Sequence, residues 1–295
     1  MLMLNLKHGK SIYVAFGLTV LLWATAFPII KIALHDFKAE NLSALRLLIA
    51  TLILFLIGII KRIPLPDLRD IPFIILLGFC GFTVYHVALS IGEAYVSAGV
   101  ASLIVSTTPI FSALLAIFFL REKFSKLAWL GSIVAFIGVG FISLGNGDKL
   151  TAFLLGVISI LLASFGESIY FTFQKSFLEK YGFLPFTIYT IIAGTLCMSV
   201  FLPNSFHELV NAHMPSIISV LYLGVFPTVI PYITLAYTIQ KVGVSDATIS
   251  LYLTPAISLV LAYFLLGEIP TLLAIIGGVI TLIGVTITSI NTEDK

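Results

Sequence analysis

The segment TTPIFSALLAIFFLRE at residues 107–122 returns as LTPAISLVLAYFLLGE at residues 253–268. Each copy carries a Thr-Pro pair near its start, small residues in its middle and a glutamate at its end, and the matched pairs are 146 positions apart. At this offset, 15 of the 37 positions from 107 to 143 are identical. The chain therefore contains an internal repeat.

The composition is that of a membrane protein. Of the 295 residues, 59% are hydrophobic and only 10% are charged, whereas soluble domains carry roughly a quarter charged residues. The apolar residues come in long blocks, such as Ile12 to Ile30 and Leu127 to Leu144. About 20 apolar residues suffice for one helix to cross the bilayer. We therefore expect an all-α integral membrane protein.

Helices placed on the apolar blocks give ten transmembrane spans, at 12–33, 41–60, 71–92, 98–120, 127–145, 152–174, 184–202, 215–238, 244–266 and 271–290. The segments between them are short. KRIPLPDLRD at 61–70 and PNSFHELVNAHM at 203–214, for example, are interpreted as connections because they contain polar and loop-forming residues. The start of the first span imitates a signal peptide, but its apolar run continues past residues 24–26, so we expect it to remain as a span.

The lysines and arginines are distributed unevenly over the connections. With the N-terminus placed in the cytoplasm, twelve lie on inside segments and four lie at outside ends. Because inside loops are enriched in these residues, we expect a multi-pass protein of the cell membrane with both termini cytoplasmic.

The number of spans determines how the two copies are related. Five spans separate each element from its copy, and since five is odd, the two halves cross the membrane in opposite directions. We expect residues 1–147 and 148–295 to form two inverted five-helix repeats. Such repeats are typical of secondary transporters that alternate between inward-open and outward-open shapes. The alternative is a duplication that only built a stable bundle.

The motifs resemble the drug/metabolite transporter superfamily, specifically its EamA-type families. WATAFPIIKIAL is similar to the W-[GA]-x-x-F-x-x-x-K pattern of that family through Trp23, Phe27 and Lys31, and Arg46 matches its recurrent arginine. TPIFSALLAIFFLREK and TPAISLVLAYFLLGE match the P-x-x-x-x-L/V-x-A-x-x-x-L-x-E signature in both halves. The resemblance implies a ten-helix carrier that exports amino acids, other metabolites or drugs, often with the proton gradient. A multidrug efflux carrier of the same fold is the alternative, and a channel is a more distant one.

Two ionisable residues, Glu167 and His86, lie well inside the predicted spans. Glu167 departs from the family, whose sixth span usually begins with a W-A-x-Y-like stretch where this chain has SFGESIYFTFQK. Ionisable groups in the bilayer are functional candidates by default, so we expect both residues to bind substrate or carry the coupling proton. The structural alternatives are a protonated Glu167 bonded to a neighbouring helix and a His86 bonded to a backbone carbonyl.

Five further charged residues lie closer to the predicted span ends. Lys31, Arg46 and Glu93 are expected to reach solvent or a paired partner there, although Arg46 could instead attract an anionic group of the substrate. Glu122 and Glu268 are expected at helix ends, where the positive N-terminal end of the next span favours a carboxylate.

Prolines and small residues suggest how the helices pack and move. Five prolines interior to spans are predicted hinges, with static kinks as the alternative: Pro28, Pro109, Pro227, Pro231 and Pro255. Small residues spaced by three and four predict close helix packing: Gly131, Ala135 and Gly138 in one half, and Gly277, Thr281 and Gly284 in the other.

The resemblance also implies a central cavity lined by spans one, three, four, six, eight and nine. The residues that these spans could offer are Trp23, Thr25, Tyr85, His86, Thr108, Glu167, Tyr170, Gln174, Thr228, Tyr232 and Tyr252. This aromatic, hydroxyl-rich set suits a small amphipathic or zwitterionic solute better than a phosphate-rich one, which would need several arginines. Expected partners are the small-molecule substrate, the lipid bilayer and protons, with no nucleic acid, in a monomer or homodimer.

An enzyme is disfavoured because the chain contains no H-E-x-x-H or G-x-S-x-G motif. No cofactor and no metal site are expected. Cys80 and Cys197 lie within apolar runs and are interpreted as small core residues.

Overall fold

The computed structural model describes residues 10–120, 125–144, 150–242, 247 and 253–290, and over these ranges the chain is built of helices. The first half contains α1 (Lys10–Ala33), α2 (Ala39–Ile60), α3 (Ile71–Gly78), η1 (Phe79–Val84), α4 (Tyr85–Tyr95), α5 (Ala98–Val105), α6 (Thr108–Leu120) and α7 (Lys126–Leu144). The second half contains α8 (Leu150–Phe173), α9 (Lys175–Tyr181), α10 (Phe183–Met198), η3 (Ser199–Phe201), α11 (Leu202–Asn211), α12 (Met214–Leu223), η4 (Gly224–Val229), α13 (Ile230–Val242), α15 (Thr254–Leu266) and α16 (Leu272–Ile290).

The helices confirm the expected all-α membrane fold. Seven helical segments within the described ranges are long and apolar enough to cross a membrane, and three shorter apolar helices accompany them at Lys126–Ile142, Thr254–Leu266 and Leu272–Ile287. Together they correspond to the ten predicted spans. Large apolar side chains such as Leu52, Phe55 and Phe118 remain exposed, as expected for a surface that faces lipid rather than water.

The fourth span is broken in the middle. α5 ends at Val105 and α6 begins at Thr108, so the interruption directly precedes Pro109, one of the predicted hinge residues. Pro109 has no N–H to donate. The carbonyl that this N–H would otherwise reach, Val105 O, accepts from Thr108 Oγ1 at 2.8 Å. The hydroxyl groups of Ser106 and Thr107 also donate to the carbonyls three residues before them, at 2.6 and 2.8 Å. Whether this interruption moves during transport stays a prediction.

The other prolines lie in different local settings. Pro28 lies inside α1, which remains helical through it. Pro227 lies in η4, a π-helical turn whose counterpart in the first half is η1, and Pro231 follows in the first turn of α13. Pro255 lies in the first turn of α15, where a missing N–H costs nothing.

One predicted connection is wrong. Residues 203–214 were expected to be a loop, but α11 occupies most of this segment. Pro203 lies in the first turn of α11, where proline is favoured. The helix packs on α2, where the buried hydroxyl of Ser205 lies 3.4 Å from the side-chain oxygen of Asn41. The polar composition thus marks a surface helix rather than a loop.

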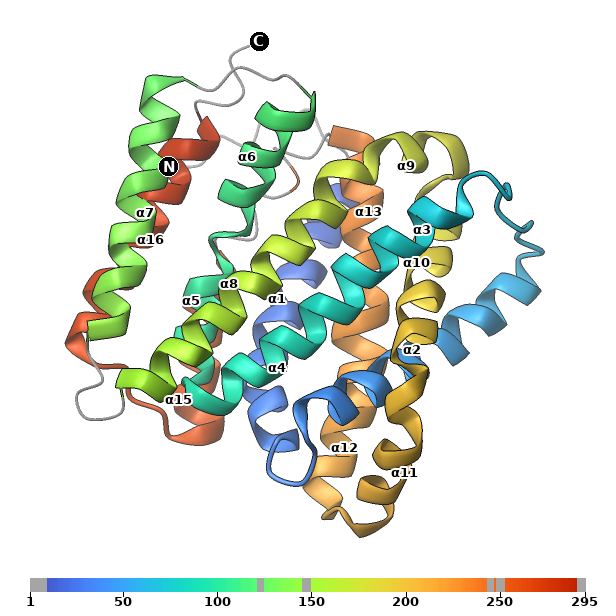
Figure 1. Ribbon diagram of the computed structural model, residues 1–295, viewed down its shortest axis with the longest axis horizontal. Coiled ribbons are helices and arrows are strands. Elements are labelled where there is room, and N and C mark those ends of the chain that lie inside the picture. The colour runs from blue at the N-terminus through green and yellow to red at the C-terminus, as the bar shows by residue number, and fades with distance from the viewer. Residues whose placement is uncertain (1–9, 121–124, 145–149, 243–246, 248–252, 291–295) are drawn as a thin grey trace.

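The contact between α7 and α16 reveals how the two halves are related. These helices run side by side along one edge of the molecule (Figure 1). A Cβ atom added to Gly138 would lie 2.6 Å from Gly277 O, and one added to Gly284 would lie 2.5 Å from Gly131 O. Shifting either pair by 146 positions gives the other pair. Along α7 the contact residue advances from Gly131 to Gly138, whereas its partner on α16 goes back from Gly284 to Gly277. The two helices are therefore antiparallel.

Such an exchange of equivalent contacts is the signature of a two-fold axis. The axis passes beside Ala135 and Thr281, which are themselves 146 positions apart and are joined by a hydrogen bond from Thr281 Oγ1 to Ala135 O at 3.3 Å. Because it relates two antiparallel helices, the axis is perpendicular to them. The inverted arrangement of the halves is therefore a property of the fold, and the sequence predicted it.

The remaining helix pairs follow the same symmetry. α4 packs on α8 as α13 packs on α1, and α6 packs on α8 as α15 packs on α1. Gly78 approaches α10 at Thr190 O and the Cβ atom of Ala193, just as Gly224 approaches α2 at Arg46 O and the Cβ atom of Ile49. The predicted boundary at residues 147 and 148 lies outside the described residues and stays a prediction.

Candidate functional site

An internal cavity lies where helices of the two halves meet. It leaves about 50 Å³ for the centres of water molecules, and since one water needs about 10–15 Å³ of such space, it has room for a few waters. Its lining is mainly aromatic and aliphatic with a few polar groups: Trp23, Ala26, Phe27, Arg46, Tyr85, His86, Leu89, Ser102, Val105, Ser106, Thr108, Pro109, Glu167, Tyr232, Thr254 and Pro255.

Six of the eleven residues predicted to contact substrate line this cavity: Trp23, Tyr85, His86, Thr108, Glu167 and Tyr232. The others lie elsewhere. Thr25 bonds to Tyr222 at 2.8 Å, and Tyr170 and Gln174 are buried outside the lining. Thr228 is not part of the lining, and its Oγ1 accepts a hydrogen bond from Arg46 Nε. Tyr252 lies outside the described residues. The role of each residue toward substrate stays a prediction.

Glu167 comes from α8 and is only 3% exposed. Thr108 Oγ1, at the start of α6, lies 3.2 Å from its carboxylate oxygen and 2.8 Å from Val105 O. A hydroxyl has a single hydrogen, and Val105 O is the closer acceptor. The Glu167 contact is therefore best satisfied when the carboxyl group carries the hydrogen and donates it to Thr108.

His86 lies on α4 and is fully buried. Its Nδ1 lies 2.9 Å from Phe82 O, so Nδ1–H donates to that carbonyl, as the structural alternative anticipated. Nε2 has no partner among the described residues. The ring packs against Tyr85 and Tyr232, with centroids 5.1 and 6.1 Å away. Nε2 is therefore available to a solute or a water in the cavity.

Trp23 and Tyr232 form an aromatic wall. Their rings meet edge to face with centroids 5.3 Å apart. Trp23 Nε1 donates to Pro227 O at 3.1 Å. That carbonyl is free because residue 231, four positions later, is a proline with no N–H. The two prolines of η4 and α13 thus help to orient an aromatic side chain of the other half, in addition to any role as hinges.

Arg46 corrects the expectation that it reaches the interface. Its side chain is only 3% exposed and lines the cavity. Nε donates to Thr228 Oγ1 at 3.1 Å, whereas one terminal nitrogen has no partner among the described residues. The close approach of Gly224 to the Arg46 backbone packs η4 onto α2, which holds the guanidinium inside the protein and prevents it from extending to the interface.

Glu93 was also expected to reach solvent or a paired partner, and this is wrong, since neither of its carboxylate oxygens has a hydrogen-bond partner among the described residues. It is fully buried. Gly92 and Gly156 bring α4 and α8 into contact beside it, which excludes water. Lys31 is half-buried and donates to the backbone carbonyls of Glu93 and Val96, the latter at 2.8 Å. Lys31 therefore ends on backbone acceptors rather than in solvent.

Glu268 behaves as a helix-end carboxylate. It accepts from Ala98 N at 3.2 Å and Gly99 N at 3.4 Å, the first N–H groups of α5. The predicted interaction with a positive helix N-terminus is therefore present, although the helix belongs to the other half and is not the span that follows. Glu122 lies outside the described residues.

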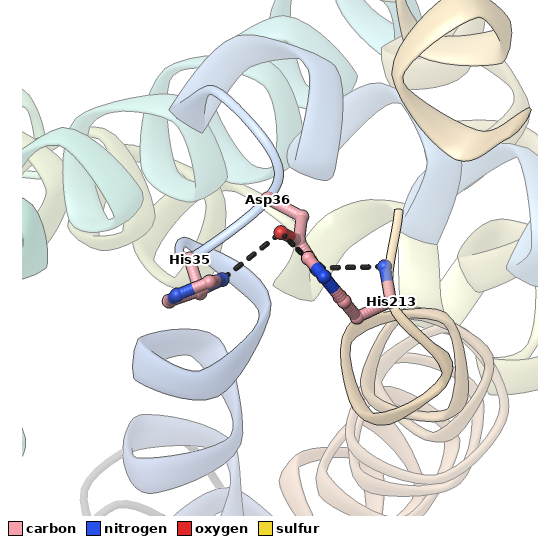
Figure 2. A group of neighbouring side chains, drawn as sticks. All are labelled: His35, Asp36 and His213. Carbon is pink, nitrogen blue, oxygen red and sulfur yellow. Dashed lines mark hydrogen bonds and ion pairs between the residues drawn. The ribbon is translucent and has the colours of Figure 1, made fainter. Parts of the chain in front are cut away.

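Two polar clusters join the halves at equivalent places. Asp36, three residues before α2, accepts a hydrogen bond from His213 Nδ1 at 3.0 Å, and His213 immediately precedes α12. Figure 2 shows His35 on the other side of this carboxylate, with its Nδ1 at 2.9 Å. Lys180, three residues before α10, binds Asp70 at 2.6 Å, and Asp70 immediately precedes α3.

We call the contacts around Asp36 and Lys180 the end links. Hydrogen bonds from Ser216 and His213 hold the pKa of Asp36 well below its ordinary value. Ion pairing with Asp67 and Asp70 raises the pKa of Lys180. The His35, Asp36 and His213 side chains also place three possible metal-ligand atoms within 4.8 Å of one another. The matching position of the Lys180 link explains this cluster as a structural contact.

Comparison with known proteins agrees with the fold. The profile of the EamA-like transporter family matches residues 10–144 and again residues 154–290. A crystal structure that is 17% identical in sequence superposes with a TM-score of 0.62, covering 96% of this chain and 98% of its own. This likeness concerns the fold alone.

Two relatives are similar over nearly their whole length. The uncharacterized transporter YdfC of Bacillus subtilis is 50% identical over 96% of this chain and 92% of its own. A probable terminal-alkyne amino-acid exporter of Streptantibioticus cattleyicolor is 34% identical over 95% of this chain and 93% of its own. With both halves matched by the family profile, the chain belongs to the EamA-like transporter family.

Proposed function

We propose that the protein is a secondary transporter that exports amino acids or closely related zwitterions by alternating access, with proton coupling at Glu167. One observation carries the proposal: a buried arginine and a buried glutamate, Arg46 and Glu167, line the same small aromatic cavity. A zwitterion has one group for each of them, a carboxylate for the guanidinium and an ammonium for the carboxylate.

The unpaired hydrogen-bond donor of Arg46 supports the binding of a substrate carboxylate in this cavity. One of its terminal nitrogens is buried without a partner among the described residues. Guanidinium groups bind carboxylates through two parallel hydrogen bonds, and a buried donor left unpaired is costly. A substrate carboxylate would remove that cost.

The hydrogen-bond geometry at Glu167 supports proton exchange. The contact with Thr108 favours a protonated carboxyl in the absence of substrate. When a substrate ammonium arrives, Glu167 would release its proton and pair with the ammonium as a carboxylate. One cation replaces another at the site, which is the exchange required for proton-driven export.

The size of the cavity favours a small solute over the alternative of multidrug efflux. The cavity has room for only a few waters, which suits a solute of amino-acid size better than a drug-sized ligand. The relative described as a probable terminal-alkyne amino-acid exporter also favours an amino acid as the substrate. With lysine and arginine concentrated on one side, we place both termini in the cytoplasm.

The test is counterflow and binding with the purified protein. In proteoliposomes, a panel of radiolabelled amino acids and cationic drugs should show exchange of amino acids only. Arg46→Gln should weaken binding of amino acids about 10- to 150-fold, because one charged hydrogen-bonding site is worth about 1.5–3 kcal/mol. Amines of the same shape without the carboxylate should be unaffected.

Arg69→Gln is the matched control, since Arg69 is exposed and lies in the connection before α3. Binding is read as the shift in melting temperature with ligand, because a binder stabilises the folded state by mass action. Equal affinity of the Arg46 and Arg69 variants for amino acids, or the absence of amino-acid exchange in the wild type, would refute the proposal.

A further inference from the structure

Glu93 is a buried carboxyl group near the outer end of α4 that the proposed transport mechanism does not use. It is completely inaccessible to solvent. Neither of its carboxylate oxygens has a hydrogen-bond partner among the described residues. An ionised carboxylate without partners in an apolar environment is prohibitively costly, so the group is neutral in this conformation and carries a proton.

The charged groups around Glu93 are engaged elsewhere. Those close enough to interact with it electrostatically are Lys31, Glu268 and Arg46. Lys31 Nζ donates to two backbone carbonyls, Glu268 accepts from the N-terminus of α5, and Arg46 Nε donates to Thr228. α8 contributes the apolar neighbours Gly156 and Ile160 at this level.

The position of Glu93 connects it to the cavity. It follows the cavity residues His86 and Leu89 by seven and four positions on α4, so all three share one helical face. At 1.5 Å per residue, Glu93 lies about 10 Å beyond His86 along the helix. It therefore occupies the stretch between the cavity and the end of α4 that the charge distribution places outside.

The inverted repeat supplies an internal comparison. The counterpart of Glu93 at the 146-residue offset is Ile239, which is 2% exposed and belongs to a hydrophobic core cluster to which both halves contribute. The fold thus accommodates an apolar side chain at this position. Glu93 is therefore not required for packing, and its burial costs free energy that an isoleucine would not cost.

We propose that Glu93 is a second proton-binding site of the transporter, located between the cavity and the outer surface, with Lys31 as the counter-ion of its deprotonated form. In the protonated form the carboxyl group is neutral and Lys31 stays on the carbonyls of Glu93 and Val96. On loss of the proton, the Lys31 ammonium moves from these carbonyls to the carboxylate. The proton leaves toward the cavity or the outer surface, and the charge left behind is paired.

This inference rests on the proposed function only where it concerns transport; the protonation itself can be measured without a substrate. Infrared difference spectra of the wild type on alkalinisation should show loss of a protonated carboxyl C=O band. Glu93→Gln should lack one component of this band and Glu167→Gln another. Glu179→Gln, at an exposed glutamate of α9, should leave both unchanged. A spectrum of Glu93→Gln identical to that of the wild type would overturn the proposal.

Transport measurements then test the coupling role. Glu93→Gln should keep amino-acid counterflow and lose the acceleration produced by an imposed pH gradient. Undiminished acceleration in this variant would overturn the coupling role. If the wild type shows no amino-acid exchange, the proposed function fails, while the infrared result still decides whether Glu93 binds a proton.

Glu93→Ile guards against a simple folding defect. Because the counterpart is an isoleucine in the core, this variant should melt at a temperature equal to or above that of the wild type. A large fall in melting temperature, with counterflow and gradient-driven transport reduced in parallel, would show that Glu93 is structural and would contradict the proposal.

Discussion

Replacing Gly138 by alanine should separate the two halves at their symmetry axis. The added carbon would lie 2.4 Å from Thr281 Oγ1, 2.5 Å from Thr281 N and 2.6 Å from Gly277 O. Carbon contacts are optimal at about 3.5–4.0 Å, so α7 and α16 must move apart by roughly 1 Å. Two of the three atoms belong to the backbone and cannot rotate away. Overpacking of this kind costs about 1–3 kcal/mol.

Gly140 provides a control on the same helix. A Cβ atom there meets nothing within 4 Å, and alanine is favoured over glycine in a helix by about 0.5–1 kcal/mol. The two alanine variants should therefore differ in melting temperature in detergent by on the order of 5–10 °C, with Gly138→Ala the lower. Gly284→Ala should resemble Gly138→Ala, since it meets Ala135 N at 2.3 Å. Equal melting of the Gly138 and Gly140 variants would refute the described helix contact.

Two further predictions concern the end links. Because the pKa of Asp36 is lowered in the folded protein, its contribution to stability is complete above its unfolded pKa of about 3.9 and is lost as the pH falls below it; Asp36→Asn should therefore remove part of the loss of melting temperature between neutral and acidic pH. Lys180→Met should lower the melting temperature at low ionic strength and have little effect in concentrated salt, because its ion pairs with Asp67 and Asp70 are exposed and screened. An equal effect of Lys180→Met at both salt concentrations would contradict the ionic nature of that link.

Much of the fold could be predicted from the sequence because it depends on regular patterns. The apolar blocks determine the spans, and the 146-residue repeat with an odd number of intervening spans determines the inversion. The helix α11 was missed for a local reason. Polar residues in a short connection are compatible with either a loop or an amphipathic helix, and only packing against α2 selects the helix.

The candidate site was predicted less well. Trp23, His86 and Glu167 were found because they stand out within apolar spans. Arg46 and Glu93 were assigned to the interface because they lie near the ends of their spans. Position along a helix does not show which face is covered by a neighbour, and here Gly224 and Gly156 bring another helix onto that face. The close approach of a glycine from the opposite half was the missing information.

The symmetry of the backbone and the asymmetry of the buried polar groups have different roles. Three buried ionisable residues have an uncharged counterpart in the other half, matched through the repeat or through equivalent helix contacts: Glu93 and Ile239, His86 and Tyr232, and Arg46 and Thr190. Inverted halves can exchange conformations because their contacts are equivalent, as in α7 and α16. If the charged groups were duplicated as well, the cavity would hold twice the buried charge with no gain in access. Under the proposed alternating-access mechanism a single set is sufficient, because the scaffold would move around a site that stays in place.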